Sequence, residues 1–207
     1  MAASCDSDSS GRSSRRRFLR TTAAATAVAG ILPSAPIGAA VEPHATLTSG
    51  PLDQVTELSE HLLVYRGPIN IGIVRDGQKA LLIDAGDGRV AGALAKLGVT
   101  TVEQIDLTHH HRDQACGENR LAAAGATVGV PAAEQQWFTS PADFWNDDKH
   151  LWHLYQFRPH RLMLVEPIPV DQTFVDGDQL TFGPAKLRVI STPGHTDGSV
   201  SYLVDVD

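Results

Sequence analysis

Cysteine is scarce in this chain of 207 residues, which contains only Cys5 and Cys116. If the N-terminal segment is removed, a single thiol remains and no intramolecular disulfide can form. The sequence thus excludes a fold held together by disulfides. A core of about 165 residues must instead be stabilised by the burial of apolar side chains, with or without a bound metal.

Positive charge is also in short supply. The chain has 17 Lys and Arg against 24 Asp and Glu, a formal net charge of −7, which argues against a protein that binds nucleic acid. Residues 1–40 nevertheless hold five Arg and two Asp, a net charge of +3, so the remainder carries −10. The opposite net charges of residues 1–40 and of the rest of the chain indicate that these two segments have unrelated roles. With 42% hydrophobic and 20% charged residues, the composition excludes wholesale disorder, collagen and a coiled coil.

The basic head contains no hydrophobic run long enough for a stable membrane span. The apolar stretch at residues 21–32 has about 12 residues, whereas a transmembrane helix needs about 20. It follows the basic segment at residues 14–20 and precedes the small residues Gly38-Ala39-Ala40. This order of basic, apolar and small residues is typical of a cleavable export signal. The simplest alternative is a disordered basic tail.

The pair Arg15-Arg16, followed by Phe18-Leu19, resembles the twin-arginine signal of bacteria. The resemblance implies the twin-arginine translocation machinery as a partner and a periplasmic or secreted location. We expect residues 1–40 to be the signal peptide, with cleavage after Ala40, or after Ala35 or Ala39, and residues 41–207 to form one domain.

The body alternates between extended and helical patterns, and no linker or repeat divides it. Short runs of β-branched and apolar residues bounded by turn signals predict strands, and 3.6-residue periodicity predicts helices. The pattern indicates one α/β domain. The expected strands are 55–58, 61–66, 69–75, 79–84, 104–108, 127–130, 179–182, 186–190 and 199–204, and the expected helices are 90–97 and 116–124.

Three consecutive histidines stand where the expected strand 104–108 ends. Because residues i and i+2 of an extended segment point to the same side, His109 and His111 can converge on one point while His110 faces away. The side chain of Asp113, two residues after His111, is expected on the same side as the two histidines, where the chain bends into a helix. Two imidazoles and a carboxylate are suitable ligands for zinc or iron.

His195 provides a candidate third imidazole. It follows Pro193-Gly194, a turn that ends the expected strand 186–190 and places the histidine at a strand end. A single histidine after a turn is more often a polar surface residue. The histidine cluster earlier in the chain is what favours a role as ligand.

Together these segments resemble the metallo-β-lactamase superfamily, and its glyoxalase II branch in particular. The family motif Thr-His-x-His-x-Asp-His corresponds to residues 108–114, Ile-Asp-x-Gly to residues 83–86, and Gly-His to residues 194–195. The resemblance implies a four-layer αββα sandwich. The family's bridging Asp and last His have no counterpart in the sequence, so we expect a truncated domain whose second half is incomplete.

The resemblance also implies a mechanism. His109, His111 and His195 would bind zinc, and a zinc-bound hydroxide would attack a small-molecule ester, thioester, lactam or phosphoester. Asp113 would orient this hydroxide or accept its proton, and would be a ligand of any second metal. Asp84 would anchor the motif loop through hydrogen bonds, although capping the turn before Gly86 is an equal alternative.

Gln114 stands where the family has a histidine that binds the second metal. A neutral amide is a poorer ligand for zinc than imidazole, so we expect one tightly bound zinc and a doubtful second site. Two other functions stay open: a sulfur dioxygenase with a single iron, and a non-catalytic metal-binding fragment.

The remaining residues near the motifs have simpler interpretations. We expect His110 to support the loop, Cys116 to be a small buried helix residue, and Arg112 to face solvent or a carboxylate. The aromatic residues gathered at 137–157 favour a helix packed on the sheet over a lid across an apolar substrate.

Overall fold

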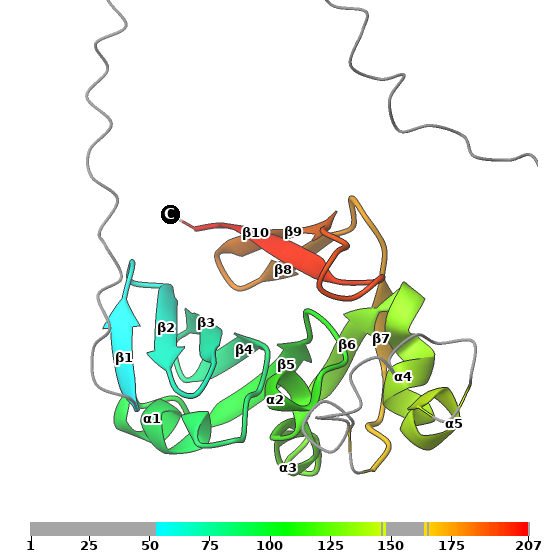
Figure 1. The fold of residues 1–207 in the computed structure, drawn as a ribbon. Coiled ribbons are helices and arrows are strands. Elements are labelled where there is room, and N and C mark those ends of the chain that lie inside the picture. The colour runs from blue at the N-terminus through cyan, green and yellow to red at the C-terminus, as the bar shows by residue number, and fades with distance from the viewer. Residues whose placement is uncertain (1–52, 146, 148–163, 165, 207) are drawn as a thin grey trace, which may run out of the picture. The chain divides into compact units, whose positions relative to one another are not determined.

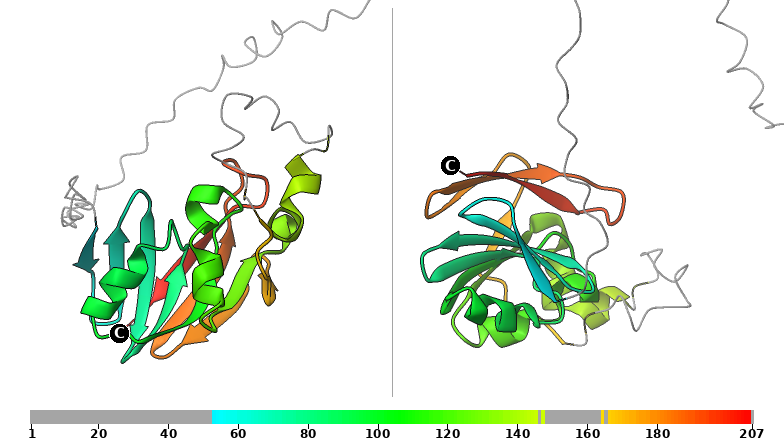
Figure 2. Two further views of the ribbon diagram at one scale, coloured as in Figure 1. Left: turned by 90° about the horizontal axis from the view of Figure 1, so that it is seen from below. Right: turned by 90° about the vertical axis from the view of Figure 1, so that its left-hand side faces the viewer.

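The computed structural model describes residues 53–145, 147, 164 and 166–206, which belong to one compact unit, Leu47–Asp207. This unit is built in layers (Figures 1 and 2): a three-stranded sheet lies against one face of a seven-stranded sheet, and short helices cover the other face. The mixed α/β class predicted from the sequence is confirmed. The expected boundary between a signal peptide and the domain lies outside the described residues.

The seven-stranded sheet follows the chain order from β1 to β7. Its first four strands are antiparallel neighbours, and β4 to β7 are parallel. The strands are β1 (Gln54–Glu57), β2 (Leu62–Arg66), β3 (Asn70–Asp76), β4 (Lys79–Ile83), β5 (Thr101–Asp106), β6 (Thr127–Pro131) and β7 (Gln172–Phe174). Parallel strands need crossover connections, and here these carry the helices.

The helices are short and lie between the parallel strands in sequence. They are α1 (Val90–Lys96), α2 (Arg112–Ala115), α3 (Glu118–Ala122), the 3₁₀ helix η1 (Ala132–Glu134), α4 (Gln135–Thr139) and α5 (Pro141–Trp145). None of the helices within the described residues is long and apolar enough to cross a membrane.

The apolar run of β4 reflects its burial on both faces. Ala80 and Leu82 pack in the core beneath the helices, whereas Leu81 packs with Val74 and Leu187 in the core between the two sheets. Side chains alternate across a strand, so a strand covered on both faces needs apolar residues at successive positions. Lys79 pairs with Asp76 across the hairpin turn that Asp76-Gly77 predicts.

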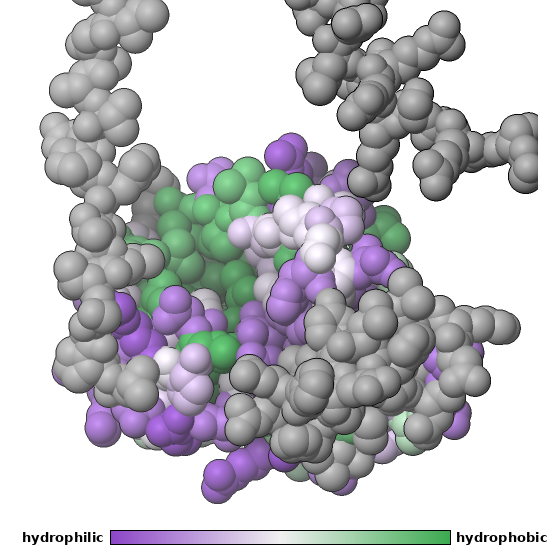
Figure 3. Space-filling model, viewed as in Figure 1, coloured by the Kyte–Doolittle hydropathy of each residue, from purple (hydrophilic) through white to green (hydrophobic). Residues whose placement is uncertain are grey.

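The second sheet contains β8 (Gln179–Phe182), β9 (Ala185–Ser191) and β10 (Val200–Asp205), antiparallel and in the order β10-β9-β8. Figure 3 shows hydrophobic side chains where β10 faces β2 to β4. The half-buried side chains of this inter-sheet core are Leu62, Ile83, Leu180, Tyr202, Val204 and Val206.

Several expected boundaries are wrong. The strand expected at 104–108 is β5, which ends at Asp106, and β7 was not expected. The helix expected at 116–124 is the shorter α3, which begins at Glu118 and ends at Ala122, and a separate helix, α2, precedes it from Arg112 to Ala115. At Gly117 the chain passes so close to Gly88 that a Cβ would lie 2.2 Å from the Gly88 nitrogen, which leaves no room for another side chain. Cys116 follows the last residue of α2 and is exposed rather than buried.

The aromatic segment contributes to the core where the structure describes it. Phe138 of α4 is fully buried in the core beneath the seven-stranded sheet, in agreement with a helix that packs on the sheet. Much of the segment, from residue 148 to 157, lies outside the described residues.

Glu118 provides a pH-dependent test of this packing. Its side chain is fully buried, and neither carboxyl oxygen has a hydrogen-bond partner within the described part of the chain. Burial, followed by the charge of Asp171, raises the pKa of Glu118 from 4.5 to about 8. Between these values the folded state binds a proton that the unfolded state releases, so Glu118 makes the protein less stable as pH rises.

We therefore expect Glu118→Gln to become more stable relative to the parent protein as pH rises from about 4.5 to about 8. Urea unfolding at several pH values, followed by circular dichroism, measures the difference. A difference that does not change with pH would contradict the burial of an uncharged Glu118 carboxyl.

Candidate metal centre

The site begins at the carboxyl ends of β4 and β5, which are parallel neighbours. Asp84 follows β4 with a φ of 65°, and its backbone N–H donates to the Asp106 carbonyl (3.0 Å). This turn directs the Asp84 carboxylate toward Thr108, whose backbone N–H (2.8 Å) and hydroxyl (3.0 Å) both lie within hydrogen-bond distance. Asp84 thus hydrogen-bonds to the residue that directly precedes the three histidines.

Thr108 connects Asp84 to the first histidine. Its hydroxyl lies 2.9 Å from Nδ1 of His109. With Asp84 ionised, the hydroxyl donates to the carboxylate and accepts from the Nδ1–H of His109. The lone pair of His109 then resides on Nε2. This atom is buried and has no hydrogen-bond partner within the described residues.

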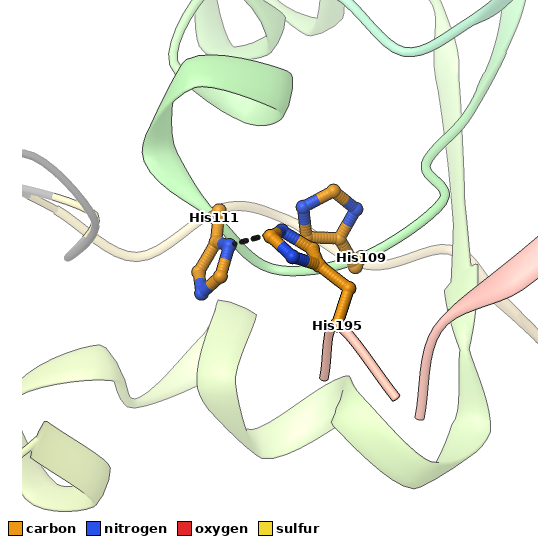
Figure 4. A group of neighbouring side chains, drawn as sticks. All are labelled: His109, His111 and His195. Atoms are coloured by element: carbon orange, nitrogen blue, oxygen red, sulfur yellow. Dashed lines mark hydrogen bonds between the residues drawn. The ribbon is translucent and has the colours of Figure 1, made fainter. Parts of the chain in front are cut away.

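His111 and His195 complete a cluster with His109, and Figure 4 shows the three rings facing one another. One ligand atom from each ring lies within 4.8 Å of the others, and the ring centroids are 4.7–4.9 Å apart. His195 comes from the loop between β9 and β10, so the site joins the two sheets. Nδ1 of His111 and Nε2 of His195 lie 2.9 Å apart.

Two of these imidazoles are held in the uncharged form. Burial, followed by the neighbouring His195 ring, lowers the pKa of His109 to about 4. Burial and then the three surrounding histidines lower the pKa of His111 to about 3. Neutral imidazole is the form that binds a metal, so no proton has to be removed from these two ligands at neutral pH.

The cluster fits a metal ion such as zinc. A buried acceptor without a partner is costly, and a cation at Nε2 of His109 removes that cost. Zinc prefers nitrogen ligands at about 2.0–2.1 Å, so ring movements of about an ångström bring three nitrogens within 4.8 Å into one coordination sphere. His109, His111 and His195 are therefore the residues that could hold the metal.

The other predicted site residues lie around this cluster. Asp113 is exposed on α2 and is not part of the group of candidate ligands, although its charge raises the pKa of both His109 and Asp84. Gln114 accepts hydrogen bonds at its backbone carbonyl from the N–H groups of Ala85 (2.8 Å) and Gly86 (2.9 Å). The catalytic role of Asp113 stays a prediction, and Gln114 holds the loop that contains Asp84.

No pattern in the sequence indicated a role for Glu134. This residue of η1 is only 2% exposed, and its Oε2 lies 2.8 Å from the backbone nitrogen and 2.7 Å from Nδ1 of His110. Burial raises the pKa of Glu134, but hydrogen bonds from His110 and Thr196 outweigh it and lower the pKa below its usual value. The His110 ring also stacks on Trp137, with centroids 4.5 Å apart. His110 thus bonds to Glu134 and is not part of the group of candidate ligands, although its ring centroid lies 4.8 Å from that of His111.

The layered α/β fold and the three convergent imidazoles define a metal-binding domain with its candidate site at the strand ends. A family model described as the metallo-beta-lactamase superfamily matches residues 64–207, and the chain belongs to this family.

Sequence relatives point to hydrolytic enzymes. The chain is 34% identical over 140 residues to a hydroxyacylglutathione hydrolase of Brucella anthropi, and the match covers 65% of this chain and 42% of the relative. A hydroxyacylglutathione hydrolase of Brucella ovis is 32% identical over the same length. The chain thus spans less than half the length of these curated relatives.

Solved structures agree on the fold. A metallo-beta-lactamase from Cronobacter sakazakii, described by its HARLDQ motif, has 25% identity and a TM-score of 0.60, and the match covers 74% of this chain and 60% of that one. BJP-1, a subclass B3 metallo-beta-lactamase of Bradyrhizobium japonicum, has 22% identity and a TM-score of 0.60. This match covers 76% of this chain and 58% of that one. The prediction of a family of hydrolytic enzymes is confirmed.

The contact between Asp84, Thr108 and His109 can be tested through metal affinity. Thr108→Val removes the hydroxyl that joins the carboxylate to the ring, and such supporting contacts are usually worth 10–100-fold in affinity. We expect zinc to bind about 10–100-fold more weakly, as measured by competition with a chromophoric chelator. Thr108→Ser keeps the hydroxyl and should retain the parent affinity. Equal zinc affinities of Thr108→Val and the parent protein would show that the hydroxyl does not support His109.

Proposed function

We propose that this protein is a zinc-dependent hydrolase that cleaves thioesters of the hydroxyacylglutathione type. The observation that carries the proposal is the cluster of His109, His111 and His195, in which a buried Nε2 of His109 has no partner within the described residues. The thioester is favoured over an ester or phosphoester because the sequence relatives from the two Brucella species, at 32–34% identity, are hydroxyacylglutathione hydrolases.

In this proposal the three histidines bind the metal, and Asp113 accepts a proton from the attacking water. A zinc ion in such a site would supply a nucleophile at neutral pH, because it would lower the pKa of a water molecule to about 7. Asp113 lies near enough to His109 for its charge to act on the ring, and it is exposed to solvent. We infer that its carboxylate orients the attacking water and accepts a proton from it.

A β-lactam is the second candidate substrate. The motif HARLDQ of the Cronobacter sakazakii enzyme begins with His and ends with Asp-Gln, as His109 to Asp113-Gln114 does here. Gln114 therefore does not separate this chain from proteins described as metallo-beta-lactamases. Both substrate classes present a carbonyl carbon to the same site, so a direct comparison distinguishes them.

Export by the twin-arginine pathway is the second part of the proposal. It is supported by Arg15-Arg16 and Phe18-Leu19 ahead of the short apolar stretch at residues 21–32, all of which lie outside the described residues. Proteins exported in this way cross the membrane already folded, which suits a metal site assembled from two sheets.

The first prediction concerns metal content and activity. We expect the purified chain to hold about one zinc after dialysis, since three histidine ligands are enough for one site. It should hydrolyse a hydroxyacylglutathione thioester faster than a β-lactam. His195→Ala should reduce zinc affinity by more than about 100-fold, because loss of a direct ligand exceeds the 10–100-fold effect of a supporting contact.

His61→Ala is the matched control for this experiment. His61 precedes β2, and its ring is hydrogen-bonded to the Arg75 carbonyl (3.1 Å), outside the cluster. The variant should keep the parent metal content and rate. Iron in place of zinc, together with oxygen consumption on a persulfide, would establish a dioxygenase instead. A chain that binds zinc but leaves both substrates intact would identify a non-catalytic metal-binding fragment.

The second prediction concerns export. Changing both Arg15 and Arg16 to Lys should retain the uncleaved protein in the cytoplasm, because the twin-arginine machinery reads the guanidinium pair and not charge alone. Changing Arg12 and Arg20 to Lys makes the same change in composition outside the pair and should leave export intact. Cell fractionation and immunoblotting measure both. Equal export of the two variants would refute the assignment.

A further inference from the structure

The buried side chain of Glu134 touches both loops that carry the candidate metal ligands. Its Oε2 accepts hydrogen bonds from the backbone N–H and the ring of His110. Its Oε1 accepts from the backbone N–H of Gly198 (3.0 Å) and from the Thr196 hydroxyl. One carboxylate thus satisfies two donors from each loop.

The partners of Glu134 are next to the ligands in sequence. His110 stands between His109 and His111, and Thr196 follows His195 directly. Glu134 itself lies in η1, directly after β6 of the seven-stranded sheet, whereas Thr196 belongs to the loop of the three-stranded sheet. The carboxylate therefore fixes the separation between two loops that no local sequence connects.

The β9–β10 loop is shaped to reach this carboxylate. A Cβ at Gly198 would lie 2.4 Å from Cγ and 3.1 Å from Oε1 of Glu134, and 3.0 Å from Cβ of Ala133. Only glycine allows the backbone to come this close. Ser199 supports the same loop, since its hydroxyl lies 2.6 Å from the Thr196 hydroxyl.

We propose that Glu134 is a positioning residue of the metal centre: it holds the His195 loop at the distance from His109 and His111 that one metal ion requires. It does not bind the metal or the substrate. The inference rests on the proposed function only for its metal-binding readout, because the placement of the loops can be measured without metal.

The decisive variant is Glu134→Gln, which preserves volume and removes one acceptor. The amide oxygen can face either the His110 N–H or the Gly198 N–H, and the NH₂ group must then face the other donor. Neither backbone donor can reverse its role. One of the two loops must therefore move away, whichever way the amide turns.

Glu118→Gln is the matched control. Glu118 is also a fully buried carboxyl, but neither of its oxygens bonds to any described residue. Both variants replace a buried glutamate by glutamine, and only Glu134→Gln breaks contacts with the ligand loops. A general effect of placing an amide at a buried glutamate position would appear in both.

The first readout uses metal-free protein. The rings of His111 and His195 have centroids 4.7 Å apart, which gives nuclear Overhauser effects between their ring protons. We expect these effects to be lost in Glu134→Gln and retained in Glu118→Gln. The second readout is zinc affinity, which should fall about 10–100-fold in Glu134→Gln and stay within twofold in Glu118→Gln. Parent-like ring contacts and zinc affinity in Glu134→Gln would overturn the proposal.

Gly198→Ala tests the same link from the other loop and does not leave a buried amide. It should also weaken zinc binding, and the double variant should lose little more than the more affected single variant, because both break one contact. If the losses in zinc-binding free energy of the two single variants add fully in the double variant, the proposal is overturned. If the parent protein binds no zinc but loses the ring contacts only on substitution of Glu134, the positioning role stands and the metal-dependent function fails.

Discussion

The hydrogen bonds between Asp84 and Thr108 set the geometry on which the candidate site depends. They join the ends of two parallel strands, and they use a carboxylate whose pKa is raised by burial to about 7 despite the opposing hydrogen bonds from Thr108. Because the Thr108 hydroxyl also contacts His109, the same atoms that close the sheet edge orient the first imidazole. The fold and the site are therefore built from shared contacts, and a change to one is transmitted to the other.

The sequence predicts those parts of the molecule in which neighbouring residues determine the outcome. His109 and His111 converge as expected for residues i and i+2, although β5 ends at Asp106 and the chain bends at residues 108–110. The turn at Asp76-Gly77 and the buried run of β4 follow from local rules. His195 joins the cluster from a loop 84 residues after His111; its place after a turn made it a candidate, and the earlier histidines and the resemblance to a family favoured it as a ligand.

The parts that were missed depend on contacts between distant segments. Glu134 is an acidic residue three positions after Pro131, and its partners lie 24 and 62–64 residues away, so no pattern in the sequence distinguishes it from a surface carboxylate. The break between α2 and α3 at Gly117 has a similar origin. It results from the close passage of Gly88, which belongs to a different loop.

Within the described residues, Nε2 of His109 is a buried acceptor without a hydrogen-bond partner. Such an acceptor costs about 1–3 kcal/mol, which a bound metal would offset. A metal at about 100 times its dissociation constant would add about 2.7 kcal/mol to the free energy of unfolding. Under the proposed function, the fraction of unfolded chains would therefore rise where metal is limiting, and proteases would degrade the chains without metal first.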